Sequence, residues 1–136
     1  MSSTHNYNWS DFINFSEELL NNVTLIKCNK EAIYRTICNR AYYGIFKLIE
    51  DFCNENNIQL PETDERGKKL TSHKKIKYYL SICNDELYRL FSSLLTYRIS
   101  ADYRKFIKIT DQAAKISIEK AKRAKVLFDR DKENWK

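Results

Sequence analysis

The sequence has few of the residues that interrupt regular structure, with 2 Gly and 1 Pro among 136 residues. Folds built from many short strands need turn-forming residues at frequent intervals, so this scarcity argues against them. Hydrophobic residues make up 43% of the chain, which is typical of a globular domain and excludes a disordered or fibrous chain. The composition therefore favours a few long helices.

Long apolar segments are also missing. No apolar run reaches the roughly 18 residues that a membrane-spanning helix needs. Residues 1–10 are polar and lack the charged start and the apolar stretch of a secretory signal. We therefore expect a soluble, cytoplasmic protein that does not enter a membrane.

The spacing of cysteine and histidine argues against a zinc site. No two cysteines form a C-x-x-C pair, and few histidines are present to join them. We expect reduced cysteines in the core, no metal and no cofactor. The residues concerned are Cys28, Cys38, Cys53, Cys83, His5 and His73.

Five segments carry apolar residues at helical spacing. They cover about 9–22, 29–56, 72–82, a fourth that begins after Asn84 and Asp85, and a fifth from about 102 to 128. They predict an all-α fold, an up-and-down bundle of four to five helices that forms a single domain over 1–136. The core lies in about 9–128. We expect the charged tail, 129–136, to fray, although Trp135 is able to dock.

Capping residues and one glycine mark particular points of these helices. Ser10, Thr71 or Ser72, and Asn84 stand where N-caps are expected. Gly44 lies inside the longest helix, where glycine costs roughly 1 kcal/mol relative to alanine. It either marks close approach by another helix or is simply tolerated there.

Charge is divided unevenly along the chain. Residues 1–67 carry 6 Lys and Arg against 10 Asp and Glu, whereas residues 68–136 carry 18 against 8. A basic half suggests a face that binds a polyanion. A lysine-rich solvated surface would give the same distribution, so charge alone leaves both interpretations open.

Three short stretches carry residues suited to chemistry: 40–46, 71–75 and 97–103. In the last of them, Arg98 extends an apolar helical face, at or near a helix C-terminus that favours a cation. Arg98 can pair with Asp102 and lock the turn, or its guanidinium can bind a phosphate. Tyr103 and Arg104 follow it closely in the chain.

His73 shares a helical face with Ile76 and Leu80, so we expect it to border the core. A place in the first turn of a helix and neighbouring lysines, among them Lys74 and Lys75, both lower the pKa of its ring. The neutral imidazole is the form that a general base needs. A lone histidine at such a position is nevertheless more often a structural residue.

Arg40, Tyr43 and Lys47 lie off the apolar stripe of the longest helix. Together they can line a nucleic-acid groove, in which rings stack on bases and cations bind phosphates. The alternative is a helix–helix contact in which Tyr42 and Tyr43 bury their rings. We favour the second alternative for at least one of the two tyrosines.

Taken in order, these stretches resemble the pattern of small HEPN-domain proteins of bacteria and archaea. That pattern has R-A-Y-Y-x-x-F in a long helix, S-H-K at the next helix, and R-x-x-A-D-Y after a leucine-rich helix. The matching residues here are 40–46, 72–74 and 98–103, and the resemblance spans about 30–128.

The resemblance implies an HEPN-like helical bundle that forms a homodimer, with the functional cleft at the dimer interface. It also implies a metal-independent endoribonuclease of a toxin–antitoxin or antiviral defence module, often partnered by a minimal nucleotidyltransferase. The catalytic signature of the family is an Arg, a polar residue and a later His. The His moves protons while the ribose 2′-OH attacks the adjacent phosphate, and the Arg stabilises the phosphoryl charge.

The sequence departs from that signature at two places. The residue after Arg98 is the apolar Ile99, and no histidine follows in the chain. Loss of a general acid or base costs on the order of 10²–10⁴ in rate. Either His73 or Asp102 substitutes for the missing histidine, or the protein binds RNA without cleaving it.

Three hypotheses result. In the first, a toxin-like ribonuclease uses Arg98 to anchor phosphate and His73, Asp102 or Tyr103 to move protons. In the second, a non-catalytic homodimer binds RNA or a nucleotide and a partner such as a nucleotidyltransferase. In the third, a helical adaptor uses the Arg98–Asp102 pair only for architecture. The first two share these RNA-binding candidates: Arg40, Tyr43, Lys47, Lys74, Lys75 and Arg104.

Overall fold

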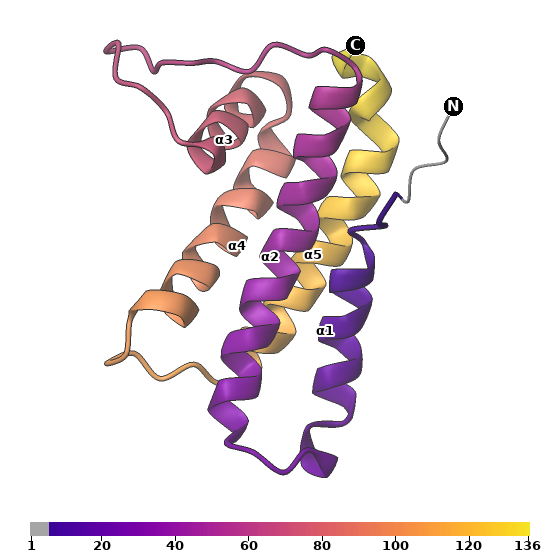
Figure 1. Ribbon diagram of the computed structural model, residues 1–136, viewed down its shortest axis with the longest axis vertical. Coiled ribbons are helices and arrows are strands. Elements are labelled where there is room, and N and C mark those ends of the chain that lie inside the picture. The colour runs from indigo at the N-terminus through magenta and orange to yellow at the C-terminus, as the bar shows by residue number, and fades with distance from the viewer. Residues whose placement is uncertain (1–5) are drawn as a thin grey trace.

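Residues 6–136 are described by a computed structural model in which five α-helices pack along one another (Figure 1). Helix makes up 71% of the structure, and the described residues form no strand, which confirms the predicted all-α bundle. His5 lies outside the described residues. The helices are α1 (Asp11–Asn21), α2 (Lys30–Glu55), α3 (Ser72–Cys83), α4 (Asp85–Tyr103) and α5 (Asp111–Asp131), with short 3-10 turns η1 (Val23–Leu25) and η2 (Lys132–Trp135).

The long helix α2 is the centre of the bundle. It packs against α1, α4 and α5 along most of its length and touches α3 near one end (Figure 1). Its predicted apolar stripe is the core, because Ile37, Ala41 and Ile45 are completely buried. Burial of a side chain the size of isoleucine stabilises a fold by about 1.5–3 kcal/mol. The stripe therefore accounts for the central place of this helix.

Gly44 is the point where α1 comes closest to α2. A Cβ atom added to Gly44 would lie 3.0 Å from Ile13 Cγ1, 3.2 Å from the Trp9 carbonyl oxygen and 3.3 Å from Phe12 Cβ. Of the two explanations for this glycine, close approach by another helix is therefore confirmed.

Side-chain caps fix the starts of four helices. The side chains of Asn29, Thr71, Asn84 and Thr110 each accept a hydrogen bond from a backbone N–H in the first turn of α2, α3, α4 and α5. Ser10 occupies the N-cap position of α1 as predicted, but its side chain makes no capping hydrogen bond. Its hydroxyl instead donates to Asn8 Oδ1 at 2.6 Å and accepts no bond from the helix.

The boundary between the last two long helices differs from the prediction. The fifth segment was expected to begin near residue 102, but α4 continues through Tyr103, and α5 begins only at Asp111. Residues 104–110 form a loop between them. The apolar face of α4 continues to the buried Ala101, which holds residues 98–103 inside α4.

Residues 56–71 form the loop between α2 and α3, in the gap between the predicted helical segments, and the C-terminal tail differs from its prediction. In the loop, Gly67 adopts a positive φ of 78°, a backbone conformation that suits glycine. The tail that was expected to fray is helical through η2. Trp135 docks there, with its ring centroid 5.7 Å from that of Phe128 and 6.0 Å from that of Phe52.

Within residues 6–136, no helix is both long and apolar enough to cross a membrane. The same residues place no three His, Cys, Asp or Glu side chains together as metal ligands. All the cysteines are free thiols, but the expectation of core cysteines is wrong for Cys28 and Cys83, which are exposed. Cys38 and Cys53 are buried as expected.

Candidate functional site

Arg98 lies on the last turns of α4, with its guanidinium turned toward α2. Its side chain is 13% exposed, so it is mostly shielded from water. Nη2 donates to the Tyr43 hydroxyl at 2.9 Å and to the Tyr103 hydroxyl at 3.3 Å. A residue of α2 and a residue of α4 thus hold the same guanidinium nitrogen.

Asp102 is the acidic partner of Arg98. Its Oδ2 lies 2.9 Å from Arg98 Nε, one helical turn away, and accepts a hydrogen bond from Asn39 Nδ2 at 2.8 Å. The Nε–H of Arg98 is not aimed at this oxygen, so Nε remains a buried donor without a hydrogen bond among the described residues. The contact is therefore an ion pair without a hydrogen bond. The pairing of Arg98 with Asp102 matches the structural alternative raised for this arginine.

Aromatic rings surround the Arg98 guanidinium. Cζ lies 5.1 Å from the centre of the Tyr43 ring, 5.3 Å from Tyr103 and 6.0 Å from Tyr42. Ring faces attract cations, and the attraction grows where water is excluded. These rings, together with Asp102, compensate for the partial burial of the positive charge.

His73 borders the core, as its spacing predicted. Its Nδ1 lies 2.5 Å from the hydroxyl of the buried Tyr42, and its ring stacks on Phe46 at a centroid distance of 4.3 Å. Burial lowers the pKa of His73, nearby Arg98 and Lys47 lower it further, and Glu50 partly opposes them. The ring is therefore neutral at neutral pH. The prediction of a lowered pKa holds, with burial as its main cause.

The hydrogen bond to Tyr42 sets what the other ring nitrogen of His73 can do. Burial raises the pKa of Tyr42, so its hydroxyl keeps its proton. When the imidazole proton is on Nδ1, that N–H donates to Tyr42, and Nε2 is left as a proton acceptor. When the proton is on Nε2, the hydroxyl donates to Nδ1, and Nε2–H becomes a proton donor. In the first tautomer Nε2 can act as a general base, and in the second it can only donate a hydrogen bond.

Arg98 and His73 both lie against the Tyr42–Tyr43 pair. The His73 ring centroid lies 5.6 Å from that of Tyr42 and 5.8 Å from that of Tyr43, the same rings that flank the guanidinium. We call this group the Arg98–His73 cluster. It consists of Arg98, His73, Asp102, Tyr42, Tyr43 and Tyr103, and so contains each of the four residues predicted to be catalytic.

The predicted RNA-binding residues are only partly brought together. Tyr43 belongs to the cluster, and Lys47 lies at its margin, where it pairs with Glu50 at 3.1 Å. Arg40 faces α1 instead, with Cζ 5.0 Å from the Phe12 ring. Because its guanidinium covers an α1 side chain, the structure separates Arg40 from the cluster.

The remaining predicted RNA-binding residues lie outside the cluster. Lys75 pairs with Glu62 of the loop before α3, at 2.9 Å. Lys74 and Arg104 are exposed and make no ion pair with any described residue. Both retain a free positive charge at the surface.

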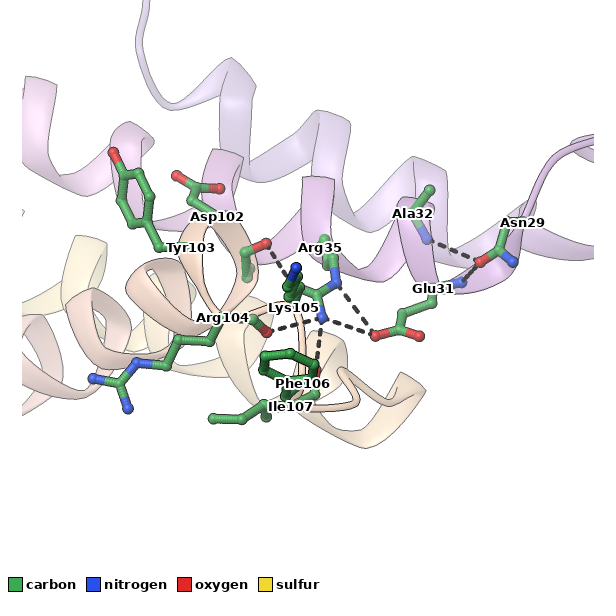
Figure 2. Close-up of a pocket in the computed structure, with 11 residues that line it drawn as sticks. Asn29, Glu31, Ala32, Arg35, Asp102, Tyr103, Arg104, Lys105, Phe106 and Ile107 are labelled. Carbon is green, nitrogen blue, oxygen red and sulfur yellow. Dashed lines mark hydrogen bonds and ion pairs between the residues drawn. The ribbon is translucent and has the colours of Figure 1, made fainter.

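Arg35 of α2 is the residue that sequence reasoning missed. Its Nη1 donates to the carbonyl oxygens of Ser100 (3.2 Å) and Ala101 (2.8 Å). Its Nη2 donates to those of Arg104 (3.3 Å) and Ile107 (2.6 Å) (Figure 2). Carbonyls at the end of a helix have no partner within that helix. Arg35 therefore completes the end of α4 and fixes the start of the loop that follows.

Glu31 completes this arrangement. Its Oε2 lies 3.0 Å from Arg35 Nη2 and accepts a hydrogen bond from the backbone N–H of Ile109 at 3.0 Å. That backbone bond and Arg35 lower the pKa of the Glu31 carboxyl. The one signal in the sequence was the Glu31–Arg35 spacing of four residues, which is typical of a helical ion pair but does not indicate a distant loop.

An open hollow of about 910 Å³ lies between the start of α2 and the loop 104–107. Arg35 lines its floor, and Asp102 and Tyr103 of the cluster lie at its edge (Figure 2). The side chain of Phe106 is 92% exposed at the tip of the loop. The hollow therefore connects the cluster with an exposed aromatic ring.

Comparisons with known proteins add no relative. No protein-family model matches the sequence, and no curated protein or solved structure is significantly similar to it.

Proposed function

We propose that this chain is an HEPN-type, RNA-directed protein that cleaves RNA without a metal ion at the Arg98–His73 cluster. We further propose that it acts in the cytoplasm as a homodimer and as a toxin-like component of a toxin–antitoxin or antiviral defence module. The observation that carries the proposal is that Arg98 of α4 and His73 of α3 both lie against the Tyr42–Tyr43 pair of α2.

In the proposed reaction, the ribose 2′-oxygen attacks the adjacent phosphorus atom, and the bond from phosphorus to the 5′-oxygen of the next nucleotide breaks. The products are a 2′,3′-cyclic phosphate and a free 5′-hydroxyl. Neutral His73 accepts the proton of the 2′-hydroxyl at Nε2. Arg98 stabilises the charge that develops on the non-bridging oxygens. The exposed Tyr103 hydroxyl supplies a proton to the leaving oxygen, and the proton that His73 took up returns through water to Tyr103.

A second candidate function is RNA or nucleotide binding without cleavage. In this alternative the homodimer also binds a partner such as a nucleotidyltransferase. This alternative is favoured because the Arg98 guanidinium already has partners. Asp102 Oδ2 lies 2.9 Å from Nε, and Nη2 donates hydrogen bonds to two tyrosine hydroxyls. A phosphate has to displace one of these groups before Arg98 can grip it with two nitrogens, as arginine does in its strongest phosphate contacts.

The test is incubation of the purified protein with total RNA in EDTA. The variants are Arg98→Ala, Arg98→Lys and His73→Ala, with Arg123→Ala as the control. Arg123 is an exposed arginine that pairs with Glu86 outside the cluster, so the control removes a positive charge of the same kind. We expect cleavage by the wild type and the control, with losses on the order of 10²–10⁴ in rate for Arg98→Ala and His73→Ala.

Arg98→Lys separates charge from geometry. Lysine retains the charge but cannot hold two phosphate oxygens with a planar fork, so we expect it to rescue little of the rate. Absence of cleavage by folded wild-type protein that still binds RNA would support the second candidate. Cleavage by Arg98→Ala at the wild-type rate would exclude the cluster as the active site.

A further inference from the structure

The loop after α4 holds Phe106 away from the core. Arg35 binds the carbonyls of Arg104 and Ile107 on either side of this residue, and Ile109 is buried with its N–H bonded to Glu31. Phe106 is 92% exposed between these anchors. The backbone is therefore held in place before and after the exposed ring.

Positive charge surrounds the ring. Arg104, Lys105 and Lys108 are exposed, and none of the three makes an ion pair within residues 6–136. Lys105 Nζ lies 5.1 Å from the Phe106 ring centroid. The side chain of Arg104 extends outward from the bundle (Figure 2).

The acidic groups nearest to this loop already have partners. Glu31 pairs with Arg35 at 3.0 Å, Asp102 lies 2.9 Å from Arg98, and Asp111 lies 3.8 Å from Lys115. Lys108 is close enough to help lower the pKa of Glu31, but none of the three acids forms an ion pair with a cation of the loop. The tip therefore offers an exposed aromatic face among unpaired positive charges.

We propose that the loop 104–108 is a binding tip for single-stranded RNA, an inference that rests on the proposed function. Phe106 stacks on an unpaired base, and Arg104, Lys105 and Lys108 hold the flanking phosphates. Single strands expose their base faces, whereas a duplex keeps its bases stacked on one another. The hollow that joins the tip to Tyr103 leads the strand toward Arg98.

Charge complementarity selects RNA over a second copy of this chain as the occupant. Two copies that met through this tip would bring two sets of the same three cations together, and like charges in contact oppose association. A polyanion instead neutralises them and releases its counterions.

The experiment measures binding of a fluorescein-labelled oligouridine of about 12 nucleotides by anisotropy, within the range of common single-strand site sizes. The oligonucleotide carries 2′-O-methyl groups, which remove the attacking hydroxyl, so binding is measured in the absence of cleavage. A 2′-O-methyl duplex of the same length is measured in parallel. The proteins are the wild type, Phe106→Ala, Phe106→Trp and Ile82→Ala.

Ile82→Ala is the matched control because Ile82 is 69% exposed just before α4, at the opposite end of that helix from the tip. We expect Phe106→Ala to weaken single-strand binding about tenfold or more, as loss of one stacked base implies. Phe106→Trp retains the affinity, and its additional indole fluorescence is quenched by the RNA. Ile82→Ala binds like the wild type, and the duplex binds more weakly.

Several outcomes overturn the inference. Wild-type affinity in Phe106→Ala would remove the tip from RNA binding while leaving the proposed function intact. A dimer that dissociates in Phe106→Ala, detected by sedimentation, would show that a second copy covers the ring. If the wild type binds neither oligonucleotide, the proposed RNA-directed function fails along with the inference.

Discussion

Burial and the charge of Arg98 act on His73 in the same direction, toward the neutral ring. Unfolding releases the ring to water, where its pKa returns to about 6.5. Below that pH the unfolded chain binds a proton that the folded chain does not yet bind. The stabilisation from neutral His73 is complete above about pH 6.5 and is lost as the pH falls through the lower pKa of the folded state.

We therefore expect the free energy of unfolding to fall between about pH 6.5 and the lower folded pKa of His73, before most carboxyl groups titrate. Urea unfolding across this range, followed by circular dichroism, measures the change. His73→Gln is the control, since glutamine keeps polar atoms without a titrating ring. A pH profile of the same slope in this variant would show that other groups cause the fall.

The contact at Gly44 gives a second prediction at this scale. Gly44→Ala gains roughly 1 kcal/mol of helix propensity, but its Cβ lies 3.2 Å from the Trp9 carbonyl, a backbone atom that cannot turn aside. Overpacking costs about 1–3 kcal/mol, so we expect a net loss of stability. Thr96→Ala, at an exposed position of α4, should not lower stability comparably. Urea unfolding measures the free energy of unfolding of both variants. A Gly44→Ala variant more stable than the wild type would contradict the tight contact.

At the scale of elements, sequence patterns located the helices because each helix has its own apolar stripe and most have a local cap. The end of α4 depends on a different kind of interaction. Arg35 binds the carbonyls of Ser100 and Ala101 from another helix, and no local spacing reveals such a contact. For that reason the predicted start of the fifth helix lay several residues too early.

The contacts of the candidate site within one helix could be predicted from the sequence, and those between helices could not. The Arg98–Asp102 pair follows from a spacing of four residues within one helix. The hydrogen bonds of Tyr43 to Arg98 and of Tyr42 to His73 join different helices, so they depend on how the bundle packs. The exposure of Phe106 could not be predicted from the sequence around it, because Arg35 and Glu31, both distant in the sequence, hold its loop in place.

Removal of Arg35 should release the loop after α4. Arg35→Met keeps the aliphatic stem and removes every hydrogen bond to the four carbonyls. A hydrogen bond to a charged group contributes a net of about 1.5–3 kcal/mol, and water can reach the freed carbonyls of the exposed loop. We expect a net loss of about 2–4 kcal/mol in the free energy of unfolding. The amide hydrogens of Ile107 and Ile109 should exchange faster with deuterium.

Arg123→Ala is the comparison for this variant, because it removes an exposed arginine whose ion pair with Glu86 contributes less than about 1 kcal/mol. Unchanged exchange at Ile107 and Ile109 in Arg35→Met would show that the loop is held without the arginine.

At the scale of the whole molecule, the C-terminal turn η2 closes one end of the bundle. Trp135 packs edge-on against Tyr79 of α3 and Phe52 of α2, with ring centroids 5.9 and 6.0 Å away. Trp135→Ala should therefore lower the free energy of unfolding by about 1–3 kcal/mol, less than for a fully buried tryptophan. Thermal unfolding followed by circular dichroism measures the loss. Glu133→Ala, on the exposed side of the same turn, should change the midpoint little.

The position of α5 has a consequence for how the protein is made. α5 packs against α1, α2 and α4, and its buried side chains include Leu127 and Phe128 near its end. A ribosome releases α1 to α4 first, so the apolar faces that α5 covers stay open to water until residues near 128 have emerged. Domains generally fold as units during synthesis. For this domain, we therefore expect cooperative folding to wait until α5 has emerged.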